Sequence, residues 1–274
     1  MGLVVNLWDN TFRHDVGATA HKPPTKIEYV RDKTSWNGIT LFVDGCTGSG
    51  TVRQIQSRVK VGWLHEPPCL HPDDYRNVDW ECLDLVLTYY EPFLSNPKAQ
   101  LIPTGGIWIP REHWGMKPKT KLCSMLYGIK MATEGHQIRP RVANAVRDLG
   151  VVDFYGREGQ PTDYGWQTKL KVLEDYAFSI IANTCWALND FDEILCDCLA
   201  VGTIPIMWGF PNYAEWFNGN SIFAFDNPTA ARQIVGNLSM ELYEAMKPAV
   251  LDNFNRVQQY EITDDLVAGA LEGL

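Results

Sequence analysis

The stretch from Tyr176 to Pro211 reads YAFSIIANTCWALNDFDEILCDCLAVGTIPIMWGFP, and it decides the fold of this chain. An apolar run from Phe178 to Ile181 predicts a strand, and the polar loop after it leads into a helix that opens between Asp190 and Glu193. A second short strand is predicted from Thr203 to Met207. Strand, helix and strand form a βαβ unit, and parallel strands of this kind bind ligands at their carboxyl ends.

The composition is that of an ordinary globular protein. The chain has 274 residues, of which 45% are hydrophobic and 21% are charged, and this length suits one or two domains. The formal charge is −9 and the sequence pI is about 5.1. This balance disfavours a nucleic-acid partner, because affinity for the phosphate backbone comes largely from Lys and Arg.

Neither a leader nor a membrane span is expected. The start, MGLVVNLWDN, has no basic segment followed by a long apolar one, and no apolar run reaches the length of a bilayer span. The seven cysteines have no repeating spacing, which is typical of reduced and mostly buried thiols. We therefore expect a cytoplasmic protein.

Alternating strands and helices predict two α/β lobes. In the first half, strands are expected at 2–7, 40–44, 60–64 and 83–88. In the second half, strands at 121–127 and 151–155 flank a helix near 139–149, and further helices follow residue 228. A Pro- and Lys-rich stretch, 110–121, reads as the linker. The predicted division is therefore a lobe at 1–112 and a lobe at 113–274, both Rossmann-like.

Three elements of the sequence resemble, in order, those of family 10 glycosyltransferases, the α-1,3/4-fucosyltransferases. Trp63-Leu-His-Glu-Pro67 resembles the W-x-x-E-x-P element, and Val152-Asp-Phe-Tyr-Gly-Arg157 resembles VD-x-[YF]-G. Tyr176–Gly209 resembles YKF-x4-EN, a TEKL-like turn and G-x-[IV]-P-[IV]-x-x-G. The resemblance covers about residues 60 to 225. It implies the GT-B fold, with an acceptor-side first lobe, a donor-binding second lobe and the active site between them.

The chain departs from that pattern at three positions. Ala177 stands for the lysine of YKF, Ala182 for the glutamate of EN, and Ile194 for the lysine that follows the glutamate of the turn. A nucleotide diphosphate attracts positive charge, so the loss of two lysines bears on the donor. The sequence leaves open whether these losses abolish activity.

Glu66 is the candidate general base. It follows the strand predicted at 60–64, in a loop held by Pro67 and Pro68, and strand ends gather ligands in such folds. The family's base falls at the glutamate of its E-x-P element. An inverting transfer needs one carboxylate to take the acceptor proton, since the nucleotide diphosphate leaves without a proton donor. The alternative is a solvated loop glutamate.

The donor pocket is expected to contain Glu193, Asn183 and Tyr155. A carboxylate at the first turn of a helix can bind the ribose hydroxyls while free N–H groups favour the phosphates, and the family's matching glutamate lies in the donor site. The alternative for Glu193 is a helix-capping acid. An arginine just before the helix preceding Val151 would bind the diphosphate, and Arg139 and Arg141 are equivalent candidates.

No metal ligands are predicted, and no cofactor is required, with stimulation by Mg²⁺ or Mn²⁺ left open. His65 and His71 lie near Asp73 and Asp74, but their spacing is not the helical H-E-x-x-H and two prolines prevent a helix there. Asp190-Phe-Asp192 has the D-x-D form that binds metal in the other large glycosyltransferase fold. Here it opens a helix, so we interpret it as a cap.

The preferred hypothesis is an inverting glycosyltransferase. It would move a sugar, fucose by default, from a GDP-linked donor to a hydroxyl of a glycan acceptor. One alternative uses another donor and a non-glycan acceptor such as a modified DNA base. A further alternative is a non-catalytic protein of the same fold that binds nucleotides or sugars, for which Ala177, Ala182 and Ile194 are the evidence.

Overall fold

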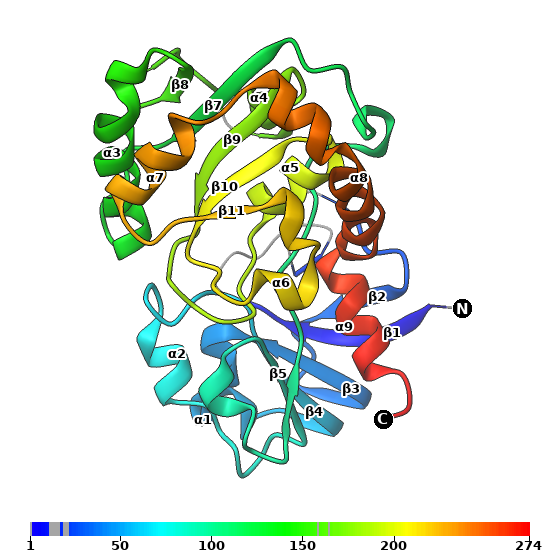
Figure 1. Cartoon of the computed structure of the whole chain (residues 1–274). Helices are drawn as coiled ribbons and strands as arrows, with labels where there is room; N and C mark the ends of the chain where they lie inside the picture. The colour runs from blue at the N-terminus through cyan, green and yellow to red at the C-terminus, as the bar shows by residue number, and fades with distance from the viewer. Residues whose placement is uncertain (1, 11–16, 19–21, 158, 164) are drawn as a thin grey trace. The chain divides into compact units, whose positions relative to one another are not determined.

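The computed structural model describes residues 2–10, 17–18, 22–157, 159–163 and 165–274. The chain divides into two compact units (Figure 1). Unit 1 comprises Met1–Thr104 together with Ile262–Leu274, and unit 2 comprises Gly105–Glu261. Each unit holds one parallel sheet, which confirms the expected α/β class with two Rossmann-like lobes.

Unit 1 contains a six-stranded sheet with the order β2-β1-β3-β4-β5-β6. Its strands are β1 (Leu3–Trp8), β2 (Ile27–Arg31), β3 (Ser35–Val43), β4 (Gln56–Leu64), β5 (Leu85–Thr88) and β6 (Ala99–Leu101). The short helical segments are η1 (Asp44–Thr47), α1 (Ser49–Val52), α2 (Pro72–Arg76) and η2 (Glu91–Phe93), and the C-terminal helix is α9 (Thr263–Leu271). The four predicted strands occur, whereas β2 was not predicted. It lies at the sheet edge with Ile27 alone buried, so it lacks the apolar run of an interior strand.

Alternate residues of β3 and β4 fill hydrophobic clusters on opposite faces of this sheet, as the two-residue period of a strand requires. One face meets helix α9, and its cluster includes Leu41, Val43, Val61, Trp63, Val267 and Leu271. The other face meets α1 and α2, and its cluster includes Phe42, Leu64, Val52 and Tyr75. Residues 39–43 of β3 and 61–64 of β4 are buried, which is why the second half of each strand reads as a mostly apolar run.

The C-terminal residues belong to unit 1, whereas the sequence placed them in the second lobe. The Asp264 carboxylate is fully buried and accepts hydrogen bonds from the Ala18 N–H and the Tyr29 hydroxyl, both at 2.8 Å. Asp265 accepts hydrogen bonds from the N–H groups of Thr25 and Lys26. The observed division therefore falls at 104/105 and again at 261/262, and not at 112/113. These contacts span more than 230 residues, so no local pattern reveals them.

Unit 2 contains a five-stranded sheet with the order β11-β10-β9-β7-β8. Its strands are β7 (Lys121–Tyr127), β8 (Val152–Gly156), β9 (Tyr176–Ala182), β10 (Ile204–Trp208) and β11 (Phe223–Ala224). Its helices are α3 (Glu134–Val146), α4 (Trp166–Leu173), α5 (Glu193–Ala200), α6 (Tyr213–Trp216), α7 (Pro228–Val235) and α8 (Met240–Val257), with the short segments η3 (Arg111–His113), η4 (Arg147–Leu149), η5 (Gly219–Ser221) and η6 (Gln258–Tyr260). The predicted βαβ unit is β9-α5-β10, with its two strands paired in parallel.

Helices cover both faces of the sheet of unit 2 (Figure 1). Residues of α3 and α7 share a hydrophobic cluster with Met125 of β7 and Ile180 of β9. On the opposite face, the Ser124 hydroxyl donates to the carbonyl of Val172 in α4 at 2.5 Å. None of the helices within the described ranges has the length and apolar content needed to cross a bilayer.

Helix α3 begins five residues earlier than predicted. It starts after the N-cap residue Thr133, whose side chain accepts a hydrogen bond from the His136 N–H. Pro140 then lies inside the helix. A proline is normally tolerated only in the first helical turn, so the sequence pattern predicts a helix that starts next to Pro140 and not at Glu134. As a consequence, Arg139 and Arg141 lie within α3 and not before it.

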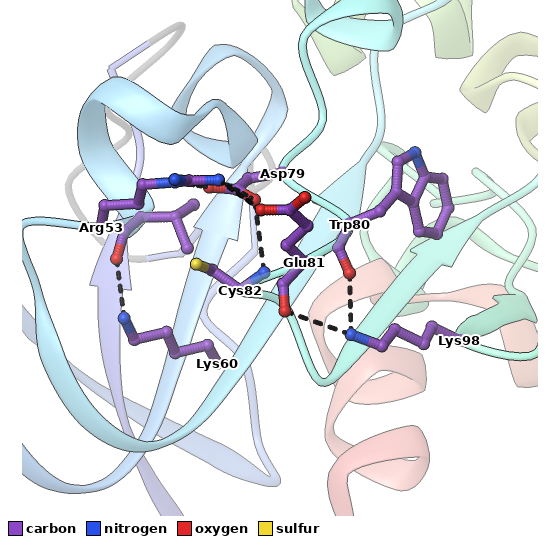
Figure 2. A network of polar contacts seen from close by, with 8 residues as sticks. Arg53, Lys60, Asp79, Trp80, Glu81, Cys82 and Lys98 are labelled. Atoms are coloured by element: carbon purple, nitrogen blue, oxygen red, sulfur yellow. Dashed lines mark hydrogen bonds and ion pairs between the residues drawn. The ribbon is translucent and has the colours of Figure 1, made fainter.

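A polar network holds the loop 79–84 that leads into β5 (Figure 2). The Arg53 guanidinium donates to the carboxylates of Asp79 at 2.7 Å and Glu81 at 2.9 Å. This hydrogen bond from Arg53 lowers the pKa of Asp79. From the other side, the Lys98 ammonium donates to two backbone carbonyls of the same loop, each at 2.7 Å. The network thus fixes the start of β5 between α1 and β6.

We predict that replacing Asp264 with alanine lowers the free energy of unfolding of unit 1 by about 2–4 kcal/mol, because two buried donors lose their acceptor. Asp265→Ala is the comparison variant. The donors to Asp265 are exposed, and water can replace the carboxylate, so we expect a loss of about 1 kcal/mol. Urea unfolding of both variants tests this. Equal losses would show that the buried Asp264 contacts do not hold the C-terminal segment.

Candidate functional site

Asn183 fixes the loop at the carboxyl end of β9. It directly follows the strand and is 1% exposed. Its backbone N–H donates to the carbonyl of Trp208 at the end of β10, at 3.0 Å. Its side-chain Nδ2 donates to the carbonyl of Asp190 at 2.6 Å. The loop is thereby tied to two neighbouring strand ends, at the edge where the sequence predicts ligand binding.

The start of helix α3 lies directly against this loop. The Gly135 N–H donates to the carbonyl of Thr184 at 3.2 Å. A Cβ at position 135 would be 1.8 Å from the carbonyl oxygen of Asn183, so only glycine permits this approach. The free N–H groups of a helix start and the positive end of the helix dipole favour anions. Helix α3 therefore brings a partial positive charge to the carboxyl end of β9.

Arg139 projects from α3 onto the same strand end. Its Nε and Nη2 both donate to the carbonyl of Ala182, at 3.2 and 2.6 Å. Burial lowers the pKa of Arg139, and the carboxylates of Asp192 and Glu193 oppose that shift. The two bonds use two of the five N–H donors of a guanidinium. The arrangement holds a cation at the strand end in a fixed orientation.

The structure separates the two arginines that the sequence left equivalent. Arg141 is exposed on α3, whereas Arg139 is half-buried against β9. Positions two residues apart point to different sides of a helix. Arg139 therefore lies with Asn183 at the strand end, and Arg141 does not.

Glu193 is the first residue of α5, and a buried lysine pairs with it. The Lys169 ammonium lies 3.0 Å from the Glu193 carboxylate and 3.1 Å from that of Asp197. It also lies 3.6 Å from the ring centroid of Trp108, whose backbone N–H donates to Asp197 at 2.9 Å. Burial would raise the pKa of Glu193, but the Lys169 charge outweighs it and lowers that pKa. Glu193 is thus held as a carboxylate with about a third of its side chain exposed.

Two buried oxygens near this cluster are unsatisfied. Within the described part of the chain, Asn183 Oδ1 and Asp192 Oδ1 have no hydrogen-bond partner. Burial and the adjacent Glu193 charge raise the pKa of Asp192. Buried polar atoms are normally hydrogen-bonded, so each of these two oxygens has capacity to accept a hydrogen bond. Asp192 occupies the N-cap position of α5, although its side chain makes no capping hydrogen bond there.

Tyr155 lies elsewhere in unit 2. Its hydroxyl is 2.7 Å from that of Tyr176, at the opposite end of β9 from Asn183. It lines a pocket between β8 and α4 that contains neither Arg139 nor Glu193. The structure therefore brings together Arg139, Asn183 and Glu193 but places Tyr155 apart from them. Tyr155 lies on the edge strand β8, and Lys171 of α4 lies 5.8 Å from its ring centroid. The sequence could not reveal this contact because α4 was not predicted.

Glu66 lies in unit 1, in the loop after β4, as predicted. The buried carboxylate of Asp44 accepts hydrogen bonds from the N–H groups of His65 and Glu66, at 2.7 and 3.0 Å. The Tyr75 hydroxyl of α2 donates to the carbonyl of Glu66 at 2.7 Å. Asp44 itself follows β3 with a left-handed backbone, φ 47°. Neighbouring elements therefore fix the backbone of Glu66 from two sides.

His71 lies near an aspartate in the segment that follows Glu66. His71 Nδ1 is 3.9 Å from Asp74 Oδ2, a single long ion pair. Among the described residues, no group of three or more His, Cys, Asp or Glu side chains could hold a metal ion.

Sequence reasoning missed two residues that orient the candidates. Lys169 belongs to α4, a helix that was not predicted, so no pattern linked it to Glu193. Asp44 was assigned to the end of a strand. A carboxylate in the first position after an apolar strand was the signal that could have identified it, because such positions face the carboxyl edge of the sheet.

Comparison with solved structures relates this fold to GT-B glycosyltransferases. The structure of an α1,3-fucosyltransferase matches with a TM-score of 0.62 and 13% identity, over 96% of this chain and 92% of that chain. An α1,3-fucosyltransferase with GDP-fucose matches with a TM-score of 0.59 and 13% identity, over 99% and 91%. The UDP-forming α,α-trehalose-phosphate synthase from Burkholderia xenovorans matches with a TM-score of 0.56 and 12% identity, over 86% and 74%.

No protein-family model matches the sequence, and no curated protein does. The likeness is one of fold: two parallel sheets form two Rossmann-like lobes, as in GT-B glycosyltransferases. The GT-B expectation is confirmed at that level.

We predict that Asp44 makes unit 1 less stable as pH rises. Burial raises the pKa of Asp44 to about 7 from an ordinary value near 4. The pKa of Asp44 is therefore higher in the folded protein than in the unfolded chain. Below about pH 4 this difference stabilises the folded state in full, and the stabilisation is lost as the pH rises from about 4 to about 7. The loss is on the order of 3 to 5 kcal/mol. In Asp44→Asn, the decline measured by urea unfolding should be smaller.

Asp32→Asn is the matched control, because Asp32 also has a left-handed backbone, φ 57°, but is exposed. It should keep the pH dependence of the parent protein. An unchanged decline in Asp44→Asn would mean that Asp44 is not protonated near neutral pH.

Proposed function

We propose that this chain is an inverting glycosyltransferase that transfers a sugar from a GDP-linked donor, fucose by default, to a hydroxyl of a glycan acceptor. The observation that carries the proposal is the cluster at the carboxyl end of β9. There, Arg139 and Asn183 meet the start of α3, and Glu193 opens α5 beside them. The fold resembles a fucosyltransferase solved with GDP-fucose, which supports the choice of donor.

The donor cluster suits a nucleoside diphosphate. The Glu193 carboxylate, oriented by Lys169, would accept hydrogen bonds from the two ribose hydroxyls. The Arg139 guanidinium and the N–H groups at the start of α3 would bind the diphosphate and stabilise the charge that grows on it as it leaves. The unsatisfied Oδ1 of Asn183 would accept a hydrogen bond from the nucleotide-sugar substrate.

Glu66 would supply the single proton-transfer step. As the acceptor oxygen attacks the anomeric carbon, the Glu66 carboxylate takes its proton. A new bond forms between acceptor oxygen and anomeric carbon, while the bond from that carbon to the diphosphate oxygen breaks. The electron pair leaves with GDP, so the diphosphate needs no proton donor. Asp44 would act as a positioning residue, because its carboxylate holds the N–H group of Glu66.

The departures from the family motif motivate one competing reading, a non-catalytic nucleotide-binding protein. Ala177, which stands where the family motif has a lysine, is fully buried in the hydrophobic cluster of unit 2 and packs in the core. Ile194 is partly buried, and the ammonium of Lys169 in α4 lies 3.0 Å from the Glu193 carboxylate. Positive charge near the turn therefore comes from a different element. This supports binding of a nucleotide-sugar donor despite the lost lysines. A measurement of turnover distinguishes a glycosyltransferase from a non-catalytic nucleotide-binding protein.

We predict that GDP raises the thermal stability of this protein more than UDP, CDP, TDP or ADP do, with or without Mn²⁺. A ligand at a hundred times its dissociation constant adds about 2.7 kcal/mol of stability. Arg139→Lys should largely remove the GDP shift, because a lysine cannot reproduce the two-pronged contact of a guanidinium. The measurement is a melting temperature at saturating nucleotide.

Arg141→Lys is the matched control on the same helix, and it should keep the full GDP shift. A shift with UDP, or only with Mn²⁺, would contradict the proposed donor or its metal independence. No shift with any nucleotide would remove the basis of the donor assignment.

We predict that Glu66→Gln lowers turnover by about 10²- to 10⁴-fold, the usual contribution of a general base, while the GDP-induced stabilisation remains. Release of GDP from GDP-fucose in the presence of a glycan acceptor panel measures turnover. Glu91→Gln, an exposed glutamate of unit 1, is the control and should keep parental activity. Undiminished turnover in Glu66→Gln would exclude Glu66 as the base, and GDP binding without turnover in the parent would favour the non-catalytic reading.

A further inference from the structure

A pocket of about 610 Å³ in unit 2 lies away from the proposed donor cluster. It lies between the edge strand β8 and helix α4, and the first residues of β7 and β9, Lys121 and Tyr176, contribute to it. Asn183 follows the last residue of β9. Seven residues of strand rise by about 20 Å, so the pocket and the donor cluster are near opposite ends of β9.

Aromatic side chains are among the residues that line the pocket. The hydroxyls of Tyr155 and Tyr176 are 2.7 Å apart, and the Tyr176 hydroxyl donates to the Asp153 carboxylate at 2.7 Å. Trp166, the first residue of α4, is partly exposed and lies against His113 in a tilted arrangement, with ring centroids 5.2 Å apart and an interplanar angle of 30°. An aromatic face with polar groups around it suits a ligand that has both an apolar face and hydroxyl groups.

The charges in the pocket disfavour both anionic and cationic ligands. Two lysines face three carboxylates among the lining residues, a formal charge of −1 that repels a phosphate. The tyrosine rings already have cations over them, with Lys121 at 5.0 Å from the Tyr176 centroid and Lys171 at 5.8 Å from that of Tyr155. A cationic ligand would have to displace these ammonium groups.

We propose that this pocket binds a neutral oligosaccharide. Each sugar hydroxyl is both donor and acceptor, and the pocket offers carboxylate acceptors beside lysine and glutamine donors. Trp166 would stack on the C–H face of a sugar ring. The volume lies within the range of pockets that enclose ligands larger than a single small ring. This inference concerns a second site and does not depend on the proposed donor or on transfer.

The test is titration of the full chain with neutral trisaccharides (maltotriose, cellotriose and chitotriose) and with N-acetyllactosamine, followed by saturation-transfer NMR and calorimetry. We expect at least one to bind in the presence of saturating GDP. Trp166→Ala should weaken that binding by about tenfold through loss of the stacking face. Lys171→Ala should weaken it by about threefold through loss of one hydrogen-bond donor.

Lys247→Ala is the matched control for Lys171→Ala. Lys247 is also a helical lysine 5.8 Å from a tyrosine ring centroid, that of Tyr243, but it does not line the pocket. It should leave oligosaccharide binding unchanged. If Trp166→Ala fails to fold, Lys171→Ala against Lys247→Ala still decides the outcome.

Three results would overturn the proposal: no oligosaccharide binds, the pocket variants bind as well as the parent, or GDP competes with the sugar. Binding of a sulfated oligosaccharide in preference to its neutral counterpart would also contradict the assigned ligand class. Failure of the GDP stabilisation experiment would leave this test intact, because the two sites are read out by different ligands and different variants.

Discussion

The close approach of helix α3 to the end of strand β9 is the contact on which the site in unit 2 depends. The backbone at Gly135 touches the carbonyl oxygens of Asn183 and Thr184, at a distance that excludes any side chain. From this anchor, the next turn of α3 places Arg139 on the carbonyl of Ala182. A helix start and a guanidinium therefore share one strand end, and both bring positive charge to it.

The acidic side of the same site depends on a buried lysine. Lys169 of the neighbouring helix α4 forms ion pairs with the carboxylates of Glu193 and Asp197, and the Trp108 ring lies against its ammonium group. Removing one partner of such a buried pair leaves an uncompensated charge, which costs far more than the pair contributes. The contact with Lys169 therefore holds the Glu193 carboxylate at the start of α5.

In unit 1 a carboxylate, and not a cation, holds the loop at the end of a strand. Asp44 bonds the N–H groups at the end of β4 and fixes the loop that carries Glu66. Its left-handed backbone is one that Asp tolerates better than most residues. In both units, residues directly after a strand are held by hydrogen bonds to a neighbouring element. The carboxyl edges of parallel sheets are thus preorganised before any ligand arrives.

The sequence by itself determined the fold class and the interior strands, and it proposed the candidate site residues. Buried strands have continuous apolar runs, and the βαβ unit from Tyr176 onward has local signals for each of its parts. Only the tertiary structure distinguished Arg139 from Arg141, moved Tyr155 into a separate pocket, assigned α9 to unit 1 and paired Lys169 with Glu193. The physical reason is the same in each case. Strand and helix periodicity is encoded by neighbours in the chain, whereas these contacts join residues from different elements whose packing no local pattern specifies.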